Sequence, residues 1–418
     1  MNAGRIAVVG SGVSGLTAAY LLRHRHDVVL FEAWDVLGGH TDTKVVAASD
    51  GAAVAVDTGF IVHNPATYPN LLRLFGELGV RTAATEMSMS VSCAECGLEY
   101  AGGNGGRGLT TRAATGVWRR YTRMLAEIPR FHRAAKAVLK SGDDERTLSD
   151  VLSFGGYSRY FVDHYALPLV SAVWSAGERP SGRYPARYLF SFLENHGLLD
   201  VRRSCGWRTV VGGARGYVDL IAERLPDVRT GTPIRSVRRH SDAVELVDAA
   251  GTRYEADGVV LATHADQALA LLADPTDQEK AALGAFQYSR NEMWLHTDRA
   301  LLPRSARARA SWNHRKARCR GGDEVVVSYH MNKLMRLCEP LDYIVTLNGV
   351  ASVDESAVLA RAVYEHPIYT RESVAAQQLL PSLTAGRTAF AGAYHGWGFH
   401  EDGCVSGAEA ARAFGATW

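Results

Sequence analysis

The sequence predicts an α/β protein in which a parallel-sheet domain is interleaved with an α+β domain. Three observations predict it: a strand, glycine turn, helix and strand within residues 5–32, a glycine turn and helix after residue 212, and a strand followed by a helix at 388–414. At 418 residues the chain suits two domains rather than one.

The N-terminal pattern is typical of a dinucleotide-binding unit. Apolar runs at 5–9 and 28–31 are expected to be buried strands, with a helix through 17–23 between them. A pyrophosphate on a helix N-terminus requires a turn without Cβ atoms, and an acid after the second strand can accept hydrogen bonds from a ribose diol. A GxGxxG turn and an acid occur at this spacing, so we expect a Rossmann-like unit lined by Gly10, Ser11, Gly12, Val13, Ser14, Gly15 and Glu32.

A second glycine turn follows this acid. Gly38 and Gly39 precede His40, and such a turn lets another stretch of backbone approach the cofactor. Here the chain resembles the FAD-dependent amine-oxidase and phytoene-desaturase superfamily, whose members carry the same acid and glycine pair, usually with arginine in place of His40. The resemblance implies FAD. The alternative is a Rossmann-like domain that binds NAD or has lost its ligand.

Two further segments carry the resemblance. Residues 56–60 are similar to the strand and turn that pass beside the flavin, which implies that Thr58, Gly59 and Phe60 lie in the site. At the far end a strand at 388–391 and the segment 392–403 lead into an alanine-rich helix at 405–414. In relatives the N-terminus of this helix points at the flavin pyrimidine edge, where its partial positive charge suits a reduced flavin. The remaining residues that the resemblance places near FAD are Gly392, Asp402, Gly403 and, beside the adenine, Ile234.

The resemblance covers nearly the whole chain and is strongest to a bacterial group of predicted FAD-dependent oxidoreductases. It implies a glutathione-reductase-type FAD-binding domain interleaved with a substrate-binding domain. The expected FAD-binding segments are 1–85, 205–285 and 375–418, and the expected substrate-binding segments are 86–204 and 286–374.

Periodicity predicts several elements in these segments. We expect helices at 69–78, 112–140, 148–154, 158–165, 184–196 and 213–225, and strands at 258–262, 293–297, 310–313, 324–330 and 343–348. Pro129 predicts a kink or break in the second helix. That helix also carries many arginines and lysines. Such a face is usually solvated, but it can also rest on anionic lipid, so peripheral membrane contact is an alternative.

Composition narrows the function classes. A formal net charge of +2 is too small to indicate nucleic-acid binding. The sequence has no apolar run long enough for a transmembrane helix and enters its first strand without a leader, so we expect a cytoplasmic protein. No pattern indicates an oligomeric state.

The six cysteines are scattered, and the only close pair is Cys93 with Cys96. A CxxC pair can supply half of a zinc site, but no second CxxC or CxxH follows it. The flanking segments 87–92 and 98–100 look like two strands of a hairpin. We therefore expect a hairpin tip with incidental thiols, and no metal.

A bound flavin accepts hydride itself, so the protein must hold a C–H bond beside it, exclude water and, in some cases, supply a base. The resemblance places His400, Tyr394 and His395 closest to the flavin, and they are the candidate catalytic residues, although packing is the alternative for each. The lysine found over the flavin in many amine oxidases is absent from 290–297. We therefore expect an FAD-dependent oxidoreductase that removes hydride from carbon in a hydrophobic small molecule such as a lipid, polyene or secondary metabolite. The alternatives are redox-neutral double-bond isomerisation, amine oxidation and a non-catalytic flavoprotein.

Overall fold

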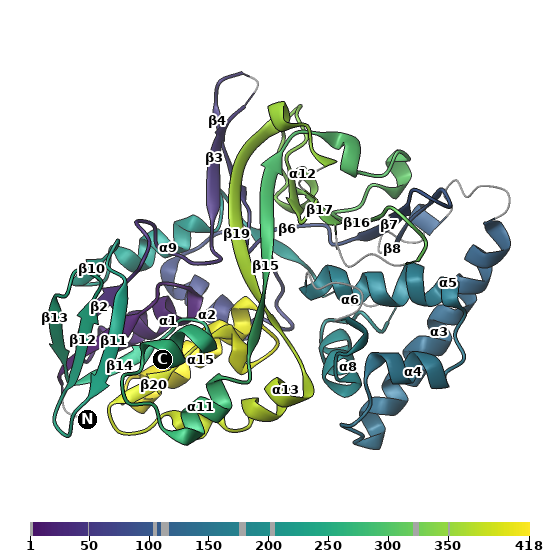
Figure 1. Cartoon of the computed structure of the whole chain (residues 1–418). Coiled ribbons are helices and arrows are strands. Elements are labelled where there is room, and N and C mark those ends of the chain that lie inside the picture. Colours follow the sequence, from purple (N-terminus) through teal and green to yellow (C-terminus); the bar gives the residue numbers. More distant parts are fainter. Residues whose placement is uncertain are drawn as a thin grey trace.

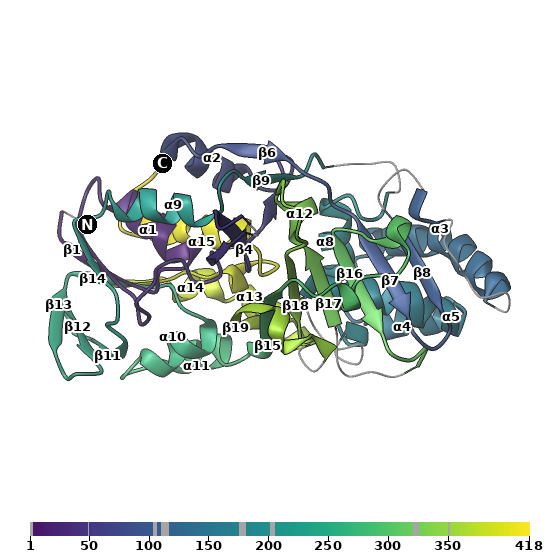
Figure 2. The same cartoon turned by 90° about the horizontal axis from the view of Figure 1, so that it is seen from above.

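The structure is a computed structural model that describes residues 3–48, 50–102, 107–109, 117–174, 181–200, 205–320, 326–349 and 352–418. A five-stranded parallel sheet lies at one end of the molecule and a group of helices at the other, with a seven-stranded sheet between them (Figures 1 and 2).

The parallel sheet is the expected Rossmann-like core. Its strand order is β10 (Asp227–Arg229), β2 (Asp27–Phe31), β1 (Arg5–Val9), β14 (Gly258–Leu261) and β20 (Thr388–Phe390). Ile6, Ala7 and Val8 of the central strand are fully buried, as expected for a parallel strand covered on both faces. The strands come from all three segments assigned to the FAD-binding domain, although the boundaries of the two domains remain a prediction.

Four helices accompany this sheet: α1 (Val13–Leu22), α2 (Pro69–Leu78), α9 (Arg215–Ala222) and α15 (His400–Ala413). The closest pair is α1 and α15, because glycines lie at the contact. A Cβ on Gly407 would lie 2.2 Å from the Ser14 carbonyl oxygen, and one on Gly403 would lie 2.6 Å from Val13 Cγ1. The first and last helices thus pack backbone to backbone (Figure 1).

The expected start of the last helix, at residue 405, is wrong, because α15 begins five positions earlier at His400. Asp402 explains the difference. Its Oδ2 accepts a 2.9 Å hydrogen bond from the Phe399 backbone N–H, as an acid in the first turn of a helix commonly does. The segment just before the helix is therefore held against the first turn.

Three small sheets flank the core. They are β11 (Ile234–Arg239) with β12 (Val244–Asp248) and β13 (Arg253–Ala256), β3 (Thr43–Ala47) with β4 (Ala53–Asp57), and β9 (Arg208–Val210) between β5 (Val62–His63) and β6 (Thr82–Ala84).

The seven-stranded sheet belongs to the other part of the chain. Its order is β19 (Val358–Ile368), β15 (Gln287–His296), β18 (Ile344–Leu347), β17 (Val326–His330), β16 (Trp312–Lys316), β7 (Met89–Cys93) and β8 (Leu98–Gly102). The strand β19 was not expected from the sequence. Burial alternates over its first six residues, but the exposed positions include Leu359 and Val363, so the sequence lacks the alternation of apolar and polar residues that would have revealed the strand.

Helices cover this sheet. They are α3 (Trp118–Ser141), α4 (Leu148–Phe154), α5 (Arg159–Phe161), a π-helical turn (Val162–Ala166), α6 (Leu167–Trp174) and α8 (Ala186–Asn195). Of the kink or break expected at Pro129, the break is wrong, since α3 continues through this residue, and the kink stays a prediction. The first residues expected in this helix, 112–116, lie outside the described residues. Arg130 lies over the Tyr157 ring and Lys136 pairs with Glu194, so part of the basic face is engaged within the protein.

The remaining helices are α10 (Ala265–Leu271), α11 (Asp277–Leu283), α12 (Met331–Leu334), α13 (Arg371–Gln377) and α14 (Leu380–Leu383). Within the described ranges, none of the helices combines the length and apolar character needed to cross a membrane.

Candidate cofactor and active site

The three glycines of the GxGxxG turn have different structural roles. Gly10 has φ +101°, and a Cβ on Gly15 would lie 1.9 Å from the Gly10 carbonyl oxygen, so the fold itself requires both. Gly12 has an ordinary φ of −64°, and a Cβ there would meet nothing within 4 Å. It also precedes a helix N-terminus without a side-chain cap. The fold does not require glycine at this position, but a ligand that approaches the first N–H groups of α1 does.

The second glycine turn closes over the first. Gly39 has φ +56°, and its Cβ would lie 3.2 Å from the Gly12 Cα, while the Gly38 N–H donates to the Ser11 carbonyl oxygen at 3.2 Å. The next residue, His40, has a buried Nε2 with no partner, and burial beside other histidines lowers its pKa. Two backbone turns and an unsatisfied imidazole nitrogen therefore meet at the start of α1.

Glu32 links the two turns. Its Oε2 accepts from the Ser11 N–H at 2.9 Å and from Ser11 Oγ at 2.5 Å, and its Oε1 accepts from the Trp34 N–H at 3.0 Å. The Ser11 hydroxyl also accepts from the Gly38 N–H at 3.1 Å. The acid expected to bind a ribose thus also fixes the glycine turn that surrounds it.

The segment after β4 reaches the same place. A Cβ on Gly59 would lie 2.1 Å from the His40 carbonyl oxygen, and that oxygen accepts from the Phe60 N–H at 2.8 Å. The Thr58 hydroxyl bonds to Tyr364 Oη at 2.7 Å. Burial raises the pKa of the neighbouring Asp57 to about 7, although this carboxylate accepts hydrogen bonds from Thr43 and from the Ala214 N–H.

His400 is the first residue of α15 and is held on two sides. Its ring stacks on Phe60 with centroids 3.8 Å apart, and its Nε2 bonds to Thr41 Oγ1 at 2.9 Å. Burial lowers its pKa to about 3, so the ring is neutral. The interactions of His400 join the second glycine turn to the N-terminus of α15.

The other two candidate catalytic residues lie just before this helix. The Tyr394 hydroxyl is buried without a partner, its ring packs on Phe286, and burial raises its pKa well above the usual value. His395 has a buried Nε2 without a partner, and burial lowers its pKa to about 4. At neutral pH the hydroxyl keeps its proton and the imidazole has a free lone pair.

The remaining residues expected near FAD hold the site together. Val13 and Ser14 pack against Gly403 in the α1–α15 contact. Burial raises the pKa of Asp402 to about 7, and its carboxylate holds the segment before α15. Gly392 has an extended backbone and donates from its N–H to Ser406 Oγ at 3.0 Å.

Ile234 begins β11, two residues after Thr232, whose N–H donates to the Glu32 carbonyl oxygen at 2.8 Å. This position is consistent with contact at the adenine end of the cofactor. The structure thus brings the segments 10–15, 32–41, 57–60 and 400–403 together, with β11 beside Glu32.

An aromatic cluster surrounds the segment that precedes α15. Phe399 stacks on Phe192 at 4.8 Å, Trp174 Nε1 donates to the Trp397 carbonyl oxygen at 3.1 Å, and Tyr188 Oη donates to the Gly396 carbonyl oxygen at 2.7 Å. The sequence shows these aromatic residues as a local enrichment in 174–192, but not which of them face this segment.

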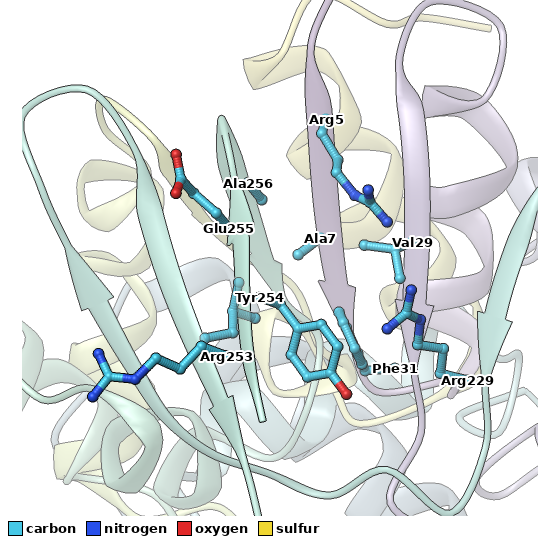
Figure 3. A pocket seen from close by; sticks show the side chains of 10 residues that line it. Arg5, Ala7, Val29, Phe31, Arg229, Arg253, Tyr254, Glu255 and Ala256 are labelled. Carbon is cyan, nitrogen blue, oxygen red and sulfur yellow. The ribbon is translucent and has the colours of Figure 1, made fainter. Parts of the chain in front are cut away.

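A cavity of about 220 Å³ lies elsewhere, between the parallel sheet and the β11–β13 sheet (Figure 3). Phe31, Tyr254 and Arg229 line it, and the Arg229 guanidinium lies 4.9 Å from the centre of the Tyr254 ring. None of its lining residues was expected to bind the cofactor, and we do not assign the cofactor to it.

The CxxC pair lies in the predicted hairpin, which is confirmed as β7 and β8. Sequence reasoning missed two further side chains beside the pair, because no second CxxC or CxxH follows it in the chain. His164 and Cys319 lie beside Cys93 and Cys96, and the four potential ligand atoms all lie within 4.8 Å of one another. No sequence pattern indicates this arrangement, because His164 and Cys319 are far from the pair along the chain.

Comparison with known proteins supports the same cofactor as the geometry. The family described as "flavin containing amine oxidoreductase" matches residues 13–332. The 15-cis-phytoene desaturase of Capsicum annuum is 45% identical over 76 residues, which are 18% of this chain and 12% of the desaturase. The chain thus spans a small part of the curated relatives that it matches.

Solved structures show the fold over almost the whole chain. A redesigned putrescine oxidase has a TM-score of 0.69 at 16% identity and covers 98% of this chain and 99% of its own. Cyclohexylamine oxidase from Brevibacterium oxydans has 0.69 at 15%, covering 98% of each chain. A fatty acid isomerase from P. acnes that produces CLA has 0.69 at 14%, covering 97% of each chain.

Proposed function

Because the chain belongs to the family of flavin containing amine oxidoreductases and is an FAD-dependent oxidoreductase, we propose that it removes hydride from carbon in a hydrophobic small molecule. A lipid, a polyene or an apolar secondary metabolite is the substrate class that we favour. The FAD is held by the two glycine turns, the uncapped start of α1, and Glu32. When bound, the flavin supplies the hydride acceptor.

The aromatic cluster before α15 is the observation that supports this substrate class. The side chains that contact residues 396–399 include Trp174 of α6, Tyr188 and Phe192 of α8, and His196, which follows α8. These aromatic rings offer a large apolar surface, and they supply no carboxylate that could pair with a cationic amine. The expected strand for the amine-oxidase lysine, β15, contains no lysine, and its Asn291 is bonded to Ser289, His366 and Asn348.

We assign different roles to the three candidate catalytic residues. His395 is the candidate base, because its unpaired Nε2 is neutral at physiological pH and can accept a proton. Tyr394 keeps its proton and can donate a hydrogen bond to a substrate oxygen. His400 is a positioning residue, since its ring nitrogen and its face are both engaged by the protein.

Double-bond isomerisation is the second candidate, favoured by the same apolar surroundings and by the fold that the chain shares with a fatty acid isomerase. Amine oxidation is the third, because two of the structural neighbours are amine oxidases. Isomerisation returns the hydride and leaves the flavin oxidised, whereas desaturation and amine oxidation both leave it reduced when no acceptor is present. The compound that is consumed separates these two oxidations.

An anaerobic screen separates these candidates. The purified yellow protein is mixed with unsaturated fatty acids, polyenes, a bacterial lipid extract and a panel of primary and secondary amines. We expect lasting loss of the oxidised flavin absorbance with an apolar compound, and a product two hydrogen atoms lighter by mass spectrometry. An isomer formed while the flavin remains oxidised would support isomerisation. Bleaching by amines alone would overturn the proposal.

Two phenylalanines of α8 give a matched test of the aromatic cluster. Phe192 stacks on Phe399, whereas Phe190 packs against Phe131 of α3. We expect Phe192→Leu to raise KM several-fold for the apolar substrate while the FAD content stays normal. Phe190→Leu should lower the melting temperature without this change in KM. If both variants changed KM equally, the proposed role of Phe192 in substrate binding would be wrong.

A further inference from the structure

Four metal-binding side chains meet outside the candidate active site, in the part of the chain that contains the seven-stranded sheet. Cys93 ends β7, Cys96 lies in the turn to β8, Cys319 follows β16, and His164 lies in the π-helical turn. Cys93 and Cys319 are separated by 226 positions in the chain, and Cys96 and His164 by 68. The cluster therefore joins three distant segments.

Two distances within the cluster match those around a tetrahedral ion, and all four potential ligand atoms lie within 4.8 Å of one another. Cys93 Sγ lies 3.7 Å from Cys319 Sγ, and Cys96 Sγ lies 3.7 Å from His164 Nε2. Zinc bonds of about 2.3 Å to sulfur and 2.0 to 2.1 Å to nitrogen place two sulfurs about 3.8 Å apart, and a sulfur and a nitrogen about 3.6 Å apart. A disulfide would instead bring two sulfurs to about 2.0 Å.

The backbone around the CxxC pair is shaped to turn both sulfurs inward. The Gly97 N–H donates to the Cys93 carbonyl oxygen at 2.9 Å, and Gly97 has φ +67°. The neighbouring strand fixes the third cysteine, because β16 runs parallel to β7 with Lys316 opposite Cys93. The Cys319 N–H donates to Glu95 Oε2 at 2.8 Å, which ties it directly to the CxxC turn.

His164 is oriented as a ligand. Its Nδ1 lies 3.1 Å from the Tyr160 carbonyl oxygen, a position that favours a proton on Nδ1 and leaves the lone pair of Nε2 directed at Cys96. The ring stacks on Tyr160 at 4.0 Å, and the His164 carbonyl oxygen accepts from Tyr100 Oη at 2.7 Å. The π-helical turn is itself a feature that proteins use mostly at functional sites.

Charge and burial complete the argument. Cys93 and His164 are 2% and 1% exposed, so water reaches the cluster little. Three thiolates and one divalent ion carry a net charge of about −1. Lys316, which is 5% exposed and lies opposite Cys93, supplies a neighbouring positive charge. Without an ion, three buried or half-buried thiols and an imidazole nitrogen would meet with poor hydrogen bonds.

We propose that Cys93, Cys96, His164 and Cys319 bind one structural Zn²⁺ ion. All four ligands come from the protein, which is typical of a structural rather than a catalytic site. The ion connects the π-helical turn between α5 and α6 to the β7–β16 pair. It thereby fixes the position of α6, which carries Trp174, relative to the sheet. The inference does not depend on the proposed substrate.

Metal analysis of the untagged holoprotein tests this proposal. The chain is produced in zinc-supplemented medium, purified in a reducing buffer without chelator, and analysed by inductively coupled plasma mass spectrometry. We expect about one zinc per chain. Cys96→Ser and Cys319→Ser should each lose most of the zinc but keep their yellow colour, which shows that the FAD-binding part is folded. Cys338→Ser is the matched control, because this exposed thiol lies outside the cluster.

The proposal would be overturned by wild-type protein that contains no zinc and takes up none, by iron in place of zinc, or by a disulfide between Cys93 and Cys319 found by mass spectrometry. Full zinc content in Cys319→Ser would also overturn it. If the variants do not fold, cobalt substitution of the wild-type protein gives the answer. Intense thiolate-to-cobalt charge-transfer absorption is expected, and its absence would exclude a cysteine-bound ion.

Discussion

Two proposed sites are built in opposite ways. One is the cofactor cradle, which consists of the glycine turns at 10–15 and 38–39 together with Glu32, and the other is the cysteine–histidine cluster. In the cradle, a Cβ on Gly12 would meet nothing within 4 Å, so the backbone there is open to a ligand, and Gly39 lets the second turn lie close to it. In the cluster, side chains from three segments converge and the backbone only places them. A site formed by the backbone requires a short contiguous motif, which can be recognised in the sequence. A site formed by side chains can draw them from distant segments, and no local motif then reveals it.

The largest expected effect on cofactor binding comes from filling the space at Gly12. We expect Gly12→Leu to lose at least about tenfold in FAD affinity, equivalent to about 1.4 kcal/mol, because the side chain occupies the space above the start of α1. Absorbance of the purified protein and titration with FAD measure it. Gly76→Leu is the control, since Gly76 lies in α2, and a Cβ there also meets nothing within 4 Å. Normal flavin content in Gly12→Leu would contradict the cradle.

Gly15, in the same motif, allows the requirements of the fold to be separated from those of FAD binding. Gly15→Ala places a Cβ 1.9 Å from a carbonyl oxygen, so we expect the apoprotein to lose about 3 kcal/mol in free energy of unfolding. Gly12→Ala should leave the stability of the apoprotein within about 0.5 kcal/mol, apart from the usual helix-cap effects. Urea denaturation of both variants measures the contrast. Equal destabilisation would mean that Gly12 is also required by the fold.

Glu32 tests how far the cradle depends on a side chain. Glu32→Gln keeps the size of the side chain but removes its negative charge. It also removes one of the two carboxylate oxygens that accept hydrogen bonds from Ser11 and from the Trp34 N–H. We expect FAD affinity to fall by a factor that corresponds to about 1 to 2 kcal/mol. Isothermal titration of the apoprotein with FAD measures this loss. An unchanged affinity would show that the backbone alone binds the cofactor.

The smallest expected effect is on the pH dependence of stability and concerns the carboxyl group of Asp402 in the first turn of α15. Burial raises the pKa of Asp402 to about 7 in the folded chain, above its usual value of 3.8. The folded state therefore holds a proton that the unfolded state releases between these two values, and stability falls as pH rises through this window. Since one pKa unit corresponds to about 1.4 kcal/mol, wild-type apoprotein should lose about 1 kcal/mol or more relative to Asp402→Asn between pH 5 and pH 8. Parallel pH profiles of the two proteins would refute this expectation.

Local patterns predicted the cofactor half well. The apolar run of β1, the glycine turn and Glu32 are neighbours in the chain, and the helix that separates them is short enough for one sequence window to contain the whole unit. The start of α15 was misplaced because its first turn contains glycine and polar residues, and only the contact of Asp402 with the Phe399 N–H shows that the helix has begun.

Long-range contacts account for what the sequence did not reveal. His164 looked like one residue of an ordinary helix, and Cys319 like an isolated thiol, until the parallel pairing of β7 with β16 and the π-helical turn brought them to the CxxC pair. The aromatic residues of α8 were visible as a group, but only the tertiary contacts show that Phe192 and Tyr188 face the segment before α15.

The packing of α15 on α1 through Gly403 and Gly407 has a consequence for biosynthesis. Helix α1, which we propose to receive the pyrophosphate, is translated well before α15, the helix that covers Val13 and Ser14. A nascent chain therefore cannot complete the proposed flavin site until α15 has left the ribosome.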